Sequence, residues 1–551
     1  MNLLSRMGDP TKARPPGADE GVLIPYTPPH EANAAVRRRR WLAALCVICF
    51  LLYGFFFAFF APFFLPLFAV PIGVLALLVV WQLPQFRRPP ARTLEVLFYA
   101  FIASLIVWPN YLAIALPGLP WITLIRLTGF PLALVFLVCL SVSRDFRSDL
   151  YQSANGLPLL WKAVLAFAAV QLLSIVLSAA KLDSTQKFVL AQIEWTAVFF
   201  ISCYVFRRPG RVEQWAMFIW LLAVIVSVIG VLEYLKDQVL WANHVPFFLK
   251  IQDPWVQQYL AGSAREATGT HRVQSTSSTP LGLAEFIALT MPFIVHFIVA
   301  EYRWQVKLAA IATVPLLLFI IVTTDSRLGV VGCLLSFALY PLYWGLRRWR
   351  LQRGSMLGPA VTLAYPAFFV ALMAATVFWR RLHVMVWGGG AQQASTDSRI
   401  DQMNQAIPMI LHNPLGHGIG LGAETLGYYN ESGVLTIDSY YLMMLLEFGI
   451  FGFALYFGML AYAIYAAGRN ALYAPPDRDF ELLAPIAIAL TNFLVIKSVF
   501  AQQDNHTIVY VLLGAVAALI YRLKQGPVVN PDAQAASAGL PVRLEAPPPI
   551  R

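Results

Sequence analysis

The chain has 551 residues, of which 59% are hydrophobic and only 13% are charged. Soluble globular proteins are about 45–50% apolar and about 25% charged, so this composition departs from that class. It also argues against nucleic-acid binding, a secreted disulfide scaffold or a coiled coil. The net charge of +11 is ordinary for a membrane protein, because cytoplasmic loops collect Lys and Arg.

Long hydrophobic runs recur along most of the chain. Each approaches the roughly 20 apolar residues that an α-helix needs to cross a bilayer. We therefore expect an all-α polytopic membrane protein with about 14 transmembrane helices, in a range of about 12–14. The expected spans cover residues 41–60, 63–82, 93–116, 121–143, 159–180, 188–206, 214–235, 279–300, 305–323, 328–346, 359–379, 438–467, 481–500 and 506–522.

The distribution of basic residues predicts the orientation of these spans. The cluster 37–40 is four consecutive arginines and precedes the first span. Alternation from there places most Lys and Arg on the cytoplasmic side, as the positive-inside rule requires. Only an even number of spans keeps this agreement, so both termini are expected in the cytoplasm. The tails, 1–36 and 523–551, are rich in Pro, Ala and charge, which predicts disorder.

Two long loops are expected on the outer side, and they divide the chain. The predicted segments are an N-terminal transmembrane bundle (37–235), a first outer loop (236–278), further transmembrane helices (279–379), a large outer loop (380–437) and C-terminal transmembrane helices (438–522). Long connections tend to be functional. The large loop contains a helix-like stretch at 397–411, and short helices are expected in both loops.

Cysteine and histidine do not predict a metal site. All five cysteines fall inside apolar segments, including the C-x-x-C pair Cys46 and Cys49, whereas zinc or redox sites need polar surroundings. His412 and His417 are five residues apart, and no cysteine or carboxylate set completes a ligand shell. We expect neither a metal nor a cofactor.

Three arginines stand out because they lie on the outer side, where basic residues should be rare. Arg272 precedes the span at 279–300, Arg327 begins the span at 328–346, and Arg399 opens the helix-like stretch. Together they would form a fork-shaped site for a diphosphate. The alternatives are a salt bridge from Arg327 to Asp325, a lipid headgroup contact, or simple solvation of Arg399.

A glycine-rich run follows the helix-like stretch, with Gly416, Gly418 and Gly420 at alternate positions. Such a backbone can approach a ligand closely or surround phosphates with N–H groups. The run lacks the Lys-Ser/Thr ending of a P-loop, and no strand precedes it. A plain turn is the alternative.

Asp438 begins the long span at 438–467 and is followed by Tyr440. An Asp there can be a helix cap or a general base at the mouth of an outer cavity. Further ionisable residues, which are expected to line the same cavity, are Glu194, Lys497, Asp504 and His506. The alternative for Glu194 and Lys497 is an ion pair between helices.

Four ordered pieces of sequence resemble the O-antigen ligase and Wzy-type O-antigen and exopolysaccharide polymerase superfamily of bacterial envelope enzymes. They cover roughly residues 272–452. The pieces are Arg272 with Pro280, Thr324-x-Ser326-Arg327, the run from Ser398-Arg399 through Ala406-Ile407 to Asn413-Pro414-Leu415-Gly416-x-Gly418, and Asp438-Ser439-Tyr440 with Glu447-x-Gly449.

The resemblance implies metal-independent transfer of a glycan from undecaprenyl diphosphate to a sugar hydroxyl, on the periplasmic face of the bacterial inner membrane. It implies that Arg272 and Arg327 hold the diphosphate, to which we add Arg399. Asp438, His417 and Glu424 are the candidate bases, with Asp325, Gly416, Gly418, Gly420, Tyr440 and His506 in support. The expected partners are the lipid-linked donor, the glycan acceptor, a chain-length regulator and a flippase, with no nucleic acid.

One departure from the family pattern favours a polymerase. The ligases usually carry a His, often followed by Asn, where this chain has Asp438-Ser439. An Asp-Ser pair looks more like the exopolysaccharide and O-antigen polymerases. The alternatives are an O-antigen ligase that transfers polymer to lipid A-core or protein, and an anion or lipid transporter. A transporter would be expected to show broken helices in paired repeats, and the sequence has no such symmetry.

Overall fold

The computed structural model describes residues 73–85, 89–115, 122–242, 244–251, 271–352, 354–380, 393–429 and 433–525, with isolated positions 41, 44, 45, 48 and 383. The chain divides into two compact units. The first comprises Met1–Ala91, Pro117–Leu119 and Leu137–Arg147, and the second comprises the rest. In the first unit, a short apolar helix spans Gly73–Gln82, and the Ser141 hydroxyl donates a hydrogen bond to the Val80 carbonyl at 2.6 Å.

Within the described residues, 11 helical segments are long and apolar enough to cross a membrane. A mostly helical, polytopic membrane protein is therefore confirmed. The segments are α3 (Leu124–Val142), α5 (Pro158–Leu177), α6 to α7 (Lys181–Val205, with a π-helical stretch η1 at Gln192–Ala197), α8 (Arg211–Lys236), α10 (Pro280–Val299), α11 (Trp304–Thr323), α12 (Arg327–Leu351), α13 (Leu357–Phe378), α17 (Tyr440–Ala471), α18 and α19 (Arg478–Glu481 and Leu483–Lys497), and α20 (His506–Gln525).

Each of these segments coincides with a predicted span. The predicted span 41–60 and much of 63–82 lie outside the described residues. The span predicted at 93–116 corresponds to α2 (Ala91–Val107), which is 17 residues long. In the part of the chain that the structure describes, three further helices lie outside these segments: α4 (Arg144–Ala154), α15 (Gln393–His412) and α16 (Gly422–Leu426). The α15 helix includes the whole helix-like stretch predicted at 397–411.

The second unit also contains a small sheet that was not predicted from the sequence. After α2, the chain forms β1 (Leu112–Ile114), which pairs antiparallel with both β2 (Ile122–Thr123) and β3 (Leu249–Ile251). The helix stops early because Pro109 has no N–H to donate and its ring opposes helical continuation. Strands this short leave no alternating pattern in an apolar sequence, so the predicted span ran through them.

The helices α10 and α20 form the centre of the second unit. In each, 89% of the membrane-length stretch is buried, against 6% for α13. Small residues allow close approach between helices. A Cβ atom on Gly514 of α20 would lie 2.6 Å from the Phe199 carbonyl oxygen of α7, so these two backbones pack in direct contact.

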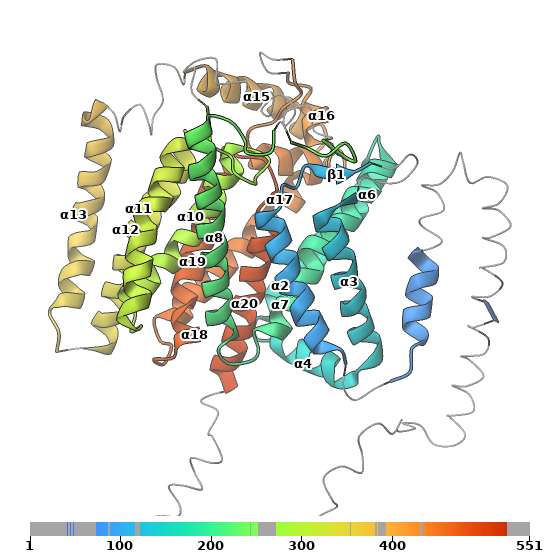
Figure 1. Ribbon diagram of the computed structural model, residues 1–551, viewed down its shortest axis with the longest axis horizontal. Coiled ribbons are helices and arrows are strands. Elements are labelled where there is room, and N and C mark those ends of the chain that lie inside the picture. The colour runs from blue at the N-terminus through green and yellow to red at the C-terminus, as the bar shows by residue number, and fades with distance from the viewer. Residues whose placement is uncertain are drawn as a thin grey trace, which may run out of the picture. The chain divides into compact units, whose positions relative to one another are not determined.

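The predicted site residues lie at one end of this helical unit. Figure 1 shows α15, α16 and β1 at the same end as the starts of α10 and α17. Basic residues expected on the cytoplasmic side make ion pairs at the opposite end of the helices: Arg347 with Glu481 at 3.2 Å, Arg478 with Glu213 at 3.3 Å and Arg522 with Asp479 at 2.6 Å.

Candidate active site

The loop before α10 brings Arg272 to the junction between α11 and α12. Its Nε donates a hydrogen bond to the Thr324 carbonyl at 2.9 Å, and Nη2 lies 3.5 Å from the Asp325 carbonyl. The Val273 N–H donates to the Thr323 carbonyl at 3.2 Å. Two of the predicted segments, at 272 and at 324–327, therefore meet in space although about 50 residues separate them.

A tight turn and close helix packing place Arg327 at this end. Asp325 has a φ of 47°, in the left-handed region, and the Ser326 side chain caps α12 by accepting from the Gly329 N–H at 3.4 Å. A Cβ atom on Gly329 would lie 2.9 Å from the Ala284 Cβ of α10. This lack of space fixes the first turn of α12, and hence Arg327, against α10.

Arg399 lies beside Asp438. Its Nε is 3.8 Å from Asp438 Oδ2, with side chains 30% and 32% exposed. The Asp438 N–H donates to Gln402 Oε1 at 2.9 Å, so two residues of α15 hold the start of α17. Burial raises the pKa of Asp438 above its ordinary value, and Arg399 and Gln402 partly oppose this shift.

The glycine-rich run docks on α17. Gly416, Gly418 and Gly420 have φ values of 91°, 110° and 81°, which side chains rarely tolerate. A Cβ on Gly416 would lie 2.5 Å from the Glu447 carbonyl oxygen. The N–H groups of His417 and Gly418 donate to the carbonyls of α17 at 2.8 and 3.1 Å. Close packing on the α17 backbone thus explains Gly416, whereas a Cβ on Gly418 would meet Ser178 and one on Gly420 would meet the Lys187 side chain. The N–H groups of His417 and Gly418 are used within the protein.

The docking point is a break in α17 itself. Gly449 has φ 64° and ψ −169°, which interrupts the helix. The freed N–H of the next residue, Ile450, donates to the Pro414 carbonyl at 3.0 Å. The glycine-rich run therefore replaces hydrogen bonds that the kinked helix has lost.

The other two candidate bases lie along the same run. His417 is half-buried, and its Nδ1 is 3.1 Å from the Leu446 carbonyl. Because a carbonyl only accepts, Nδ1 carries the proton there. Glu424, in α16, is exposed. Of the three candidate bases, Asp438 is the one whose described contacts include an arginine that is predicted to bind the diphosphate, Arg399.

Lys497 pairs with Glu285, and not with Glu194 as the alternative interpretation had it. Lys497 Nζ lies 2.9 Å from Glu285 Oε1, and both side chains are 0% exposed. Sequence reasoning missed Glu285, although a lone carboxylate inside the apolar run of α10 was the available signal, because burial of such a group in a membrane span is costly.

Tyr440 and His506 join Lys497 in this buried cluster. The Tyr440 and His506 ring centroids are 4.6 Å apart, and Lys497 Nζ lies 5.5 Å from the Tyr440 ring. His506 also stacks on Trp195, at 5.3 Å. Both residues are fully buried.

The end of α19 contacts both the start of α12, which carries Arg327, and the start of α17, which follows Asp438. Leu328, next to Arg327, packs against the cluster of Ala288, Ile496 and Phe500, and a Cβ on Gly332 of α12 would lie 3.3 Å from Ile496 Cδ1. Tyr441, three residues after Asp438, donates its hydroxyl to the Leu494 carbonyl at 2.7 Å. The start of α12 and the start of α17 therefore contact the same short stretch of α19.

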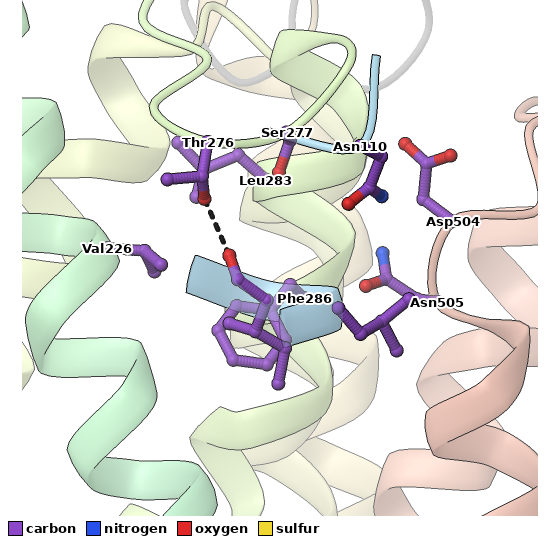
Figure 2. A pocket seen from close by; sticks show the side chains of 10 residues that line it. Asn110, Val226, Thr276, Ser277, Leu283, Phe286, Asp504 and Asn505 are labelled. Carbon is purple, nitrogen blue, oxygen red and sulfur yellow. Dashed lines mark hydrogen bonds between the residues drawn. The ribbon is translucent and has the colours of Figure 1, made fainter. Parts of the chain in front are cut away.

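A small cavity with a mixed lining adjoins this region (Figure 2). Half of its lining is apolar, and the polar half comes from Asn110, Thr276, Ser277, Asp504 and Asn505. Its volume of about 20 Å³ suffices for roughly one water molecule. The Ser278 hydroxyl donates to Asp504 Oδ2, and the Asn505 amide donates to Glu285 Oε2 at 2.9 Å. The cavity is thus connected to the buried Glu285–Lys497 pair.

These features define a polytopic helical membrane protein with a polar, arginine-containing site at one end of its helices. A family model described as O-antigen ligase matches residues 312–457. This segment contains Arg327, Arg399, the glycine-rich run and Asp438, and the match supports the resemblance to the O-antigen ligase and Wzy-type superfamily. No curated protein matches the chain.

Proposed function

We propose that the protein is a glycosyltransferase that polymerises lipid-linked repeat units. It would move a glycan from a polyprenyl diphosphate to a sugar hydroxyl on the periplasmic face of a bacterial inner membrane. The observation that carries the proposal is the meeting of Arg272 with the turn that leads into Arg327. The O-antigen ligase match over residues 312–457 supports this chemical class.

In the proposed chemistry, Asp438 with Arg399 takes up the proton, and Arg272 with Arg327 stabilises the leaving group. The acceptor hydroxyl oxygen attacks the anomeric carbon, the bond from that carbon to the diphosphate oxygen breaks, and the hydroxyl proton passes to the Asp438 carboxylate. The departing lipid diphosphate gains negative charge, which Arg272 and Arg327 stabilise. Arg399 would orient Asp438 and add positive charge beside it.

The ligase alternative uses the same fold and donor with a different acceptor, lipid A-core or protein. The Asp438-Ser439 pair favours the polymerase, because ligases of this superfamily usually carry His there. Deleting the gene and analysing the accumulated lipid-linked glycans separates these functions. Single repeat units on the carrier would support the polymerase, and long carrier-linked chains would indicate a ligase. An unchanged lipid-linked pool would overturn both and favour transport.

Arg327→Ala tests the mechanism directly. Loss of one donor to a developing charge typically lowers turnover by roughly 10²–10³-fold. The matched control is Arg208→Ala, which removes an arginine that is 53% exposed and pairs with Glu95 at 3.6 Å. The control should polymerise normally. A correctly inserted Arg327→Ala protein with unchanged polymer yield and chain length would contradict the proposed role.

A further inference from the structure

We propose that Glu233 is a positioning residue for Arg272. Glu233 lies in the last turns of α8 and is 1% exposed. Its carboxylate binds the backbone N–H groups of Gln274 and Ser275, which follow Arg272, and the side chain of His271, which precedes it. The inference rests on the proposed function, because it concerns how a diphosphate-binding arginine is held in place.

Three hydrogen bonds join Glu233 to the loop. Oε1 accepts from the Gln274 N–H at 3.1 Å, and Oε2 accepts from the Ser275 N–H at 2.6 Å. Oε1 also lies 2.8 Å from Nε2 of His271. The contacts are with residues 271, 274 and 275, so they fall on both sides of Arg272. Hydrogen bonds to an ionised carboxylate are stronger than neutral ones.

The loop needs this support because residues 271–279 form neither helix nor strand. Ser275 has a φ of 53°, a left-handed conformation that disfavours a residue with a Cβ atom. Its hydroxyl donates to the Val226 carbonyl of α8 at 2.7 Å. Both the backbone and the side chain of Ser275 are thus bound to α8, which holds the strained turn.

The position of Arg272 follows from this anchor. Val273 is fully buried, and a Cβ on Gly230 of α8 would lie 3.0 Å from its Cγ1 atom, so the loop packs tightly on α8. The Arg272 side chain then extends to the carbonyls that end α11. One rigid connection therefore runs from α8 through Arg272 to the turn before Arg327.

Glu233→Gln tests the inference. The amide keeps the size of the side chain but replaces one accepting oxygen with a donor, which faces a backbone N–H. We expect faster hydrogen exchange at the Gln274 and Ser275 amides and turnover lower by about tenfold or more. The control is Glu213→Gln, which makes the same substitution at the other end of α8, where Glu213 pairs with Arg478. It should leave both measurements unchanged.

A double-mutant cycle separates positioning from general stability. If Glu233 acts through Arg272, Glu233→Gln combined with Arg272→Ala has the same turnover as Arg272→Ala alone. Independent, multiplicative losses would overturn the inference, and so would unchanged amide exchange in Glu233→Gln. Should Glu233→Gln fail to insert, Glu233→Asp replaces it in the cycle, because it keeps the charge but is one methylene too short to reach all three donors.

The same set of variants distinguishes failure of the proposed function. If Arg272→Ala retains wild-type turnover, the diphosphate role of Arg272 is overturned, and with it the catalytic part of the inference. The exchange measurement uses no substrate and still decides whether Glu233 anchors the loop.

Discussion

Asp438 is placed so that its ionisation can be tested. Burial raises the pKa of its carboxyl, and Arg399 acts in the opposite direction. A base must be ionised to accept a proton, so the activity of the wild-type enzyme should fall as the pH drops through a pKa above the ordinary Asp value of about 3.9. In Arg399→Ala the pKa rises further, and this acidic limb should move to higher pH. The pH profile of kcat/KM with a lipid-linked repeat unit measures both. An unmoved limb in Arg399→Ala would contradict the pairing.

The buried Glu285–Lys497 pair gives a second prediction at the residue scale. Lys497→Met leaves the Glu285 carboxylate without its cation in a site that is 0% exposed. Removing one partner of a buried pair typically costs about 3–5 kcal/mol. We expect a loss of this size in the free energy of unfolding in detergent. The double variant Glu285→Gln/Lys497→Met should recover most of the loss, and equal losses in both variants would argue against the pair.

At the scale of elements, the contact between the glycine-rich run and α17 depends on Gly449. A Cβ there would collide with the Pro414 carbonyl oxygen, and φ is 64°. Gly449→Ala should therefore destabilise the protein by more than about 1–3 kcal/mol and displace the loop that leads to α16. Gly458→Ala on the same helix is the control, because nothing lies within 4 Å of its added Cβ. It should be neutral or stabilising by about 0.5–1 kcal/mol. Thermal unfolding of the two purified variants measures the difference, and similar effects in both would contradict the docking.

Some of these elements could be predicted from the sequence, and others could not. The α15 helix and the start of α12 were predicted well, because hydropathy and capping residues are local signals. The small sheet was not, since β1 and β3 are three residues each and pair across more than 130 positions of sequence. Nor did periodicity indicate the kink in α17, where Gly449 reads as one more small residue in an apolar run.

At the scale of the whole molecule, the topology remains a prediction. The basic end of α20, with Arg522 and Lys524, predicts a cytoplasmic C-terminus. A green fluorescent protein fused after residue 551 should fluoresce, whereas alkaline phosphatase at the same place should be inactive. A fusion at residue 429, in the predicted large periplasmic loop, should give the reverse. The opposite pattern would place the arginine site in the cytoplasm and contradict the use of a periplasmic donor.

The candidate site was predicted in part. Sequence order alone placed Arg272 and Arg327 on the same face, and the structure joins Arg272 to the turn that precedes Arg327. The sequence did not predict that Arg399 would lie next to Asp438. Nor did it predict that N–H groups of the glycine-rich run would donate hydrogen bonds to α17. Those arrangements depend on which helices pack side by side, and hydropathy does not encode neighbours.

The sequence by itself determined that this is a polytopic helical membrane protein. Each helix that crosses a bilayer requires about 20 apolar residues in succession, and such a run can be recognised directly in the sequence. Its ordered motifs also pointed to the superfamily whose O-antigen ligase model matches residues 312–457. Only the tertiary structure decided that Lys497 pairs with Glu285 and that Glu233 holds the Arg272 loop. A buried charge needs whichever partner packing brings within a few ångströms, and that partner can lie anywhere in the chain.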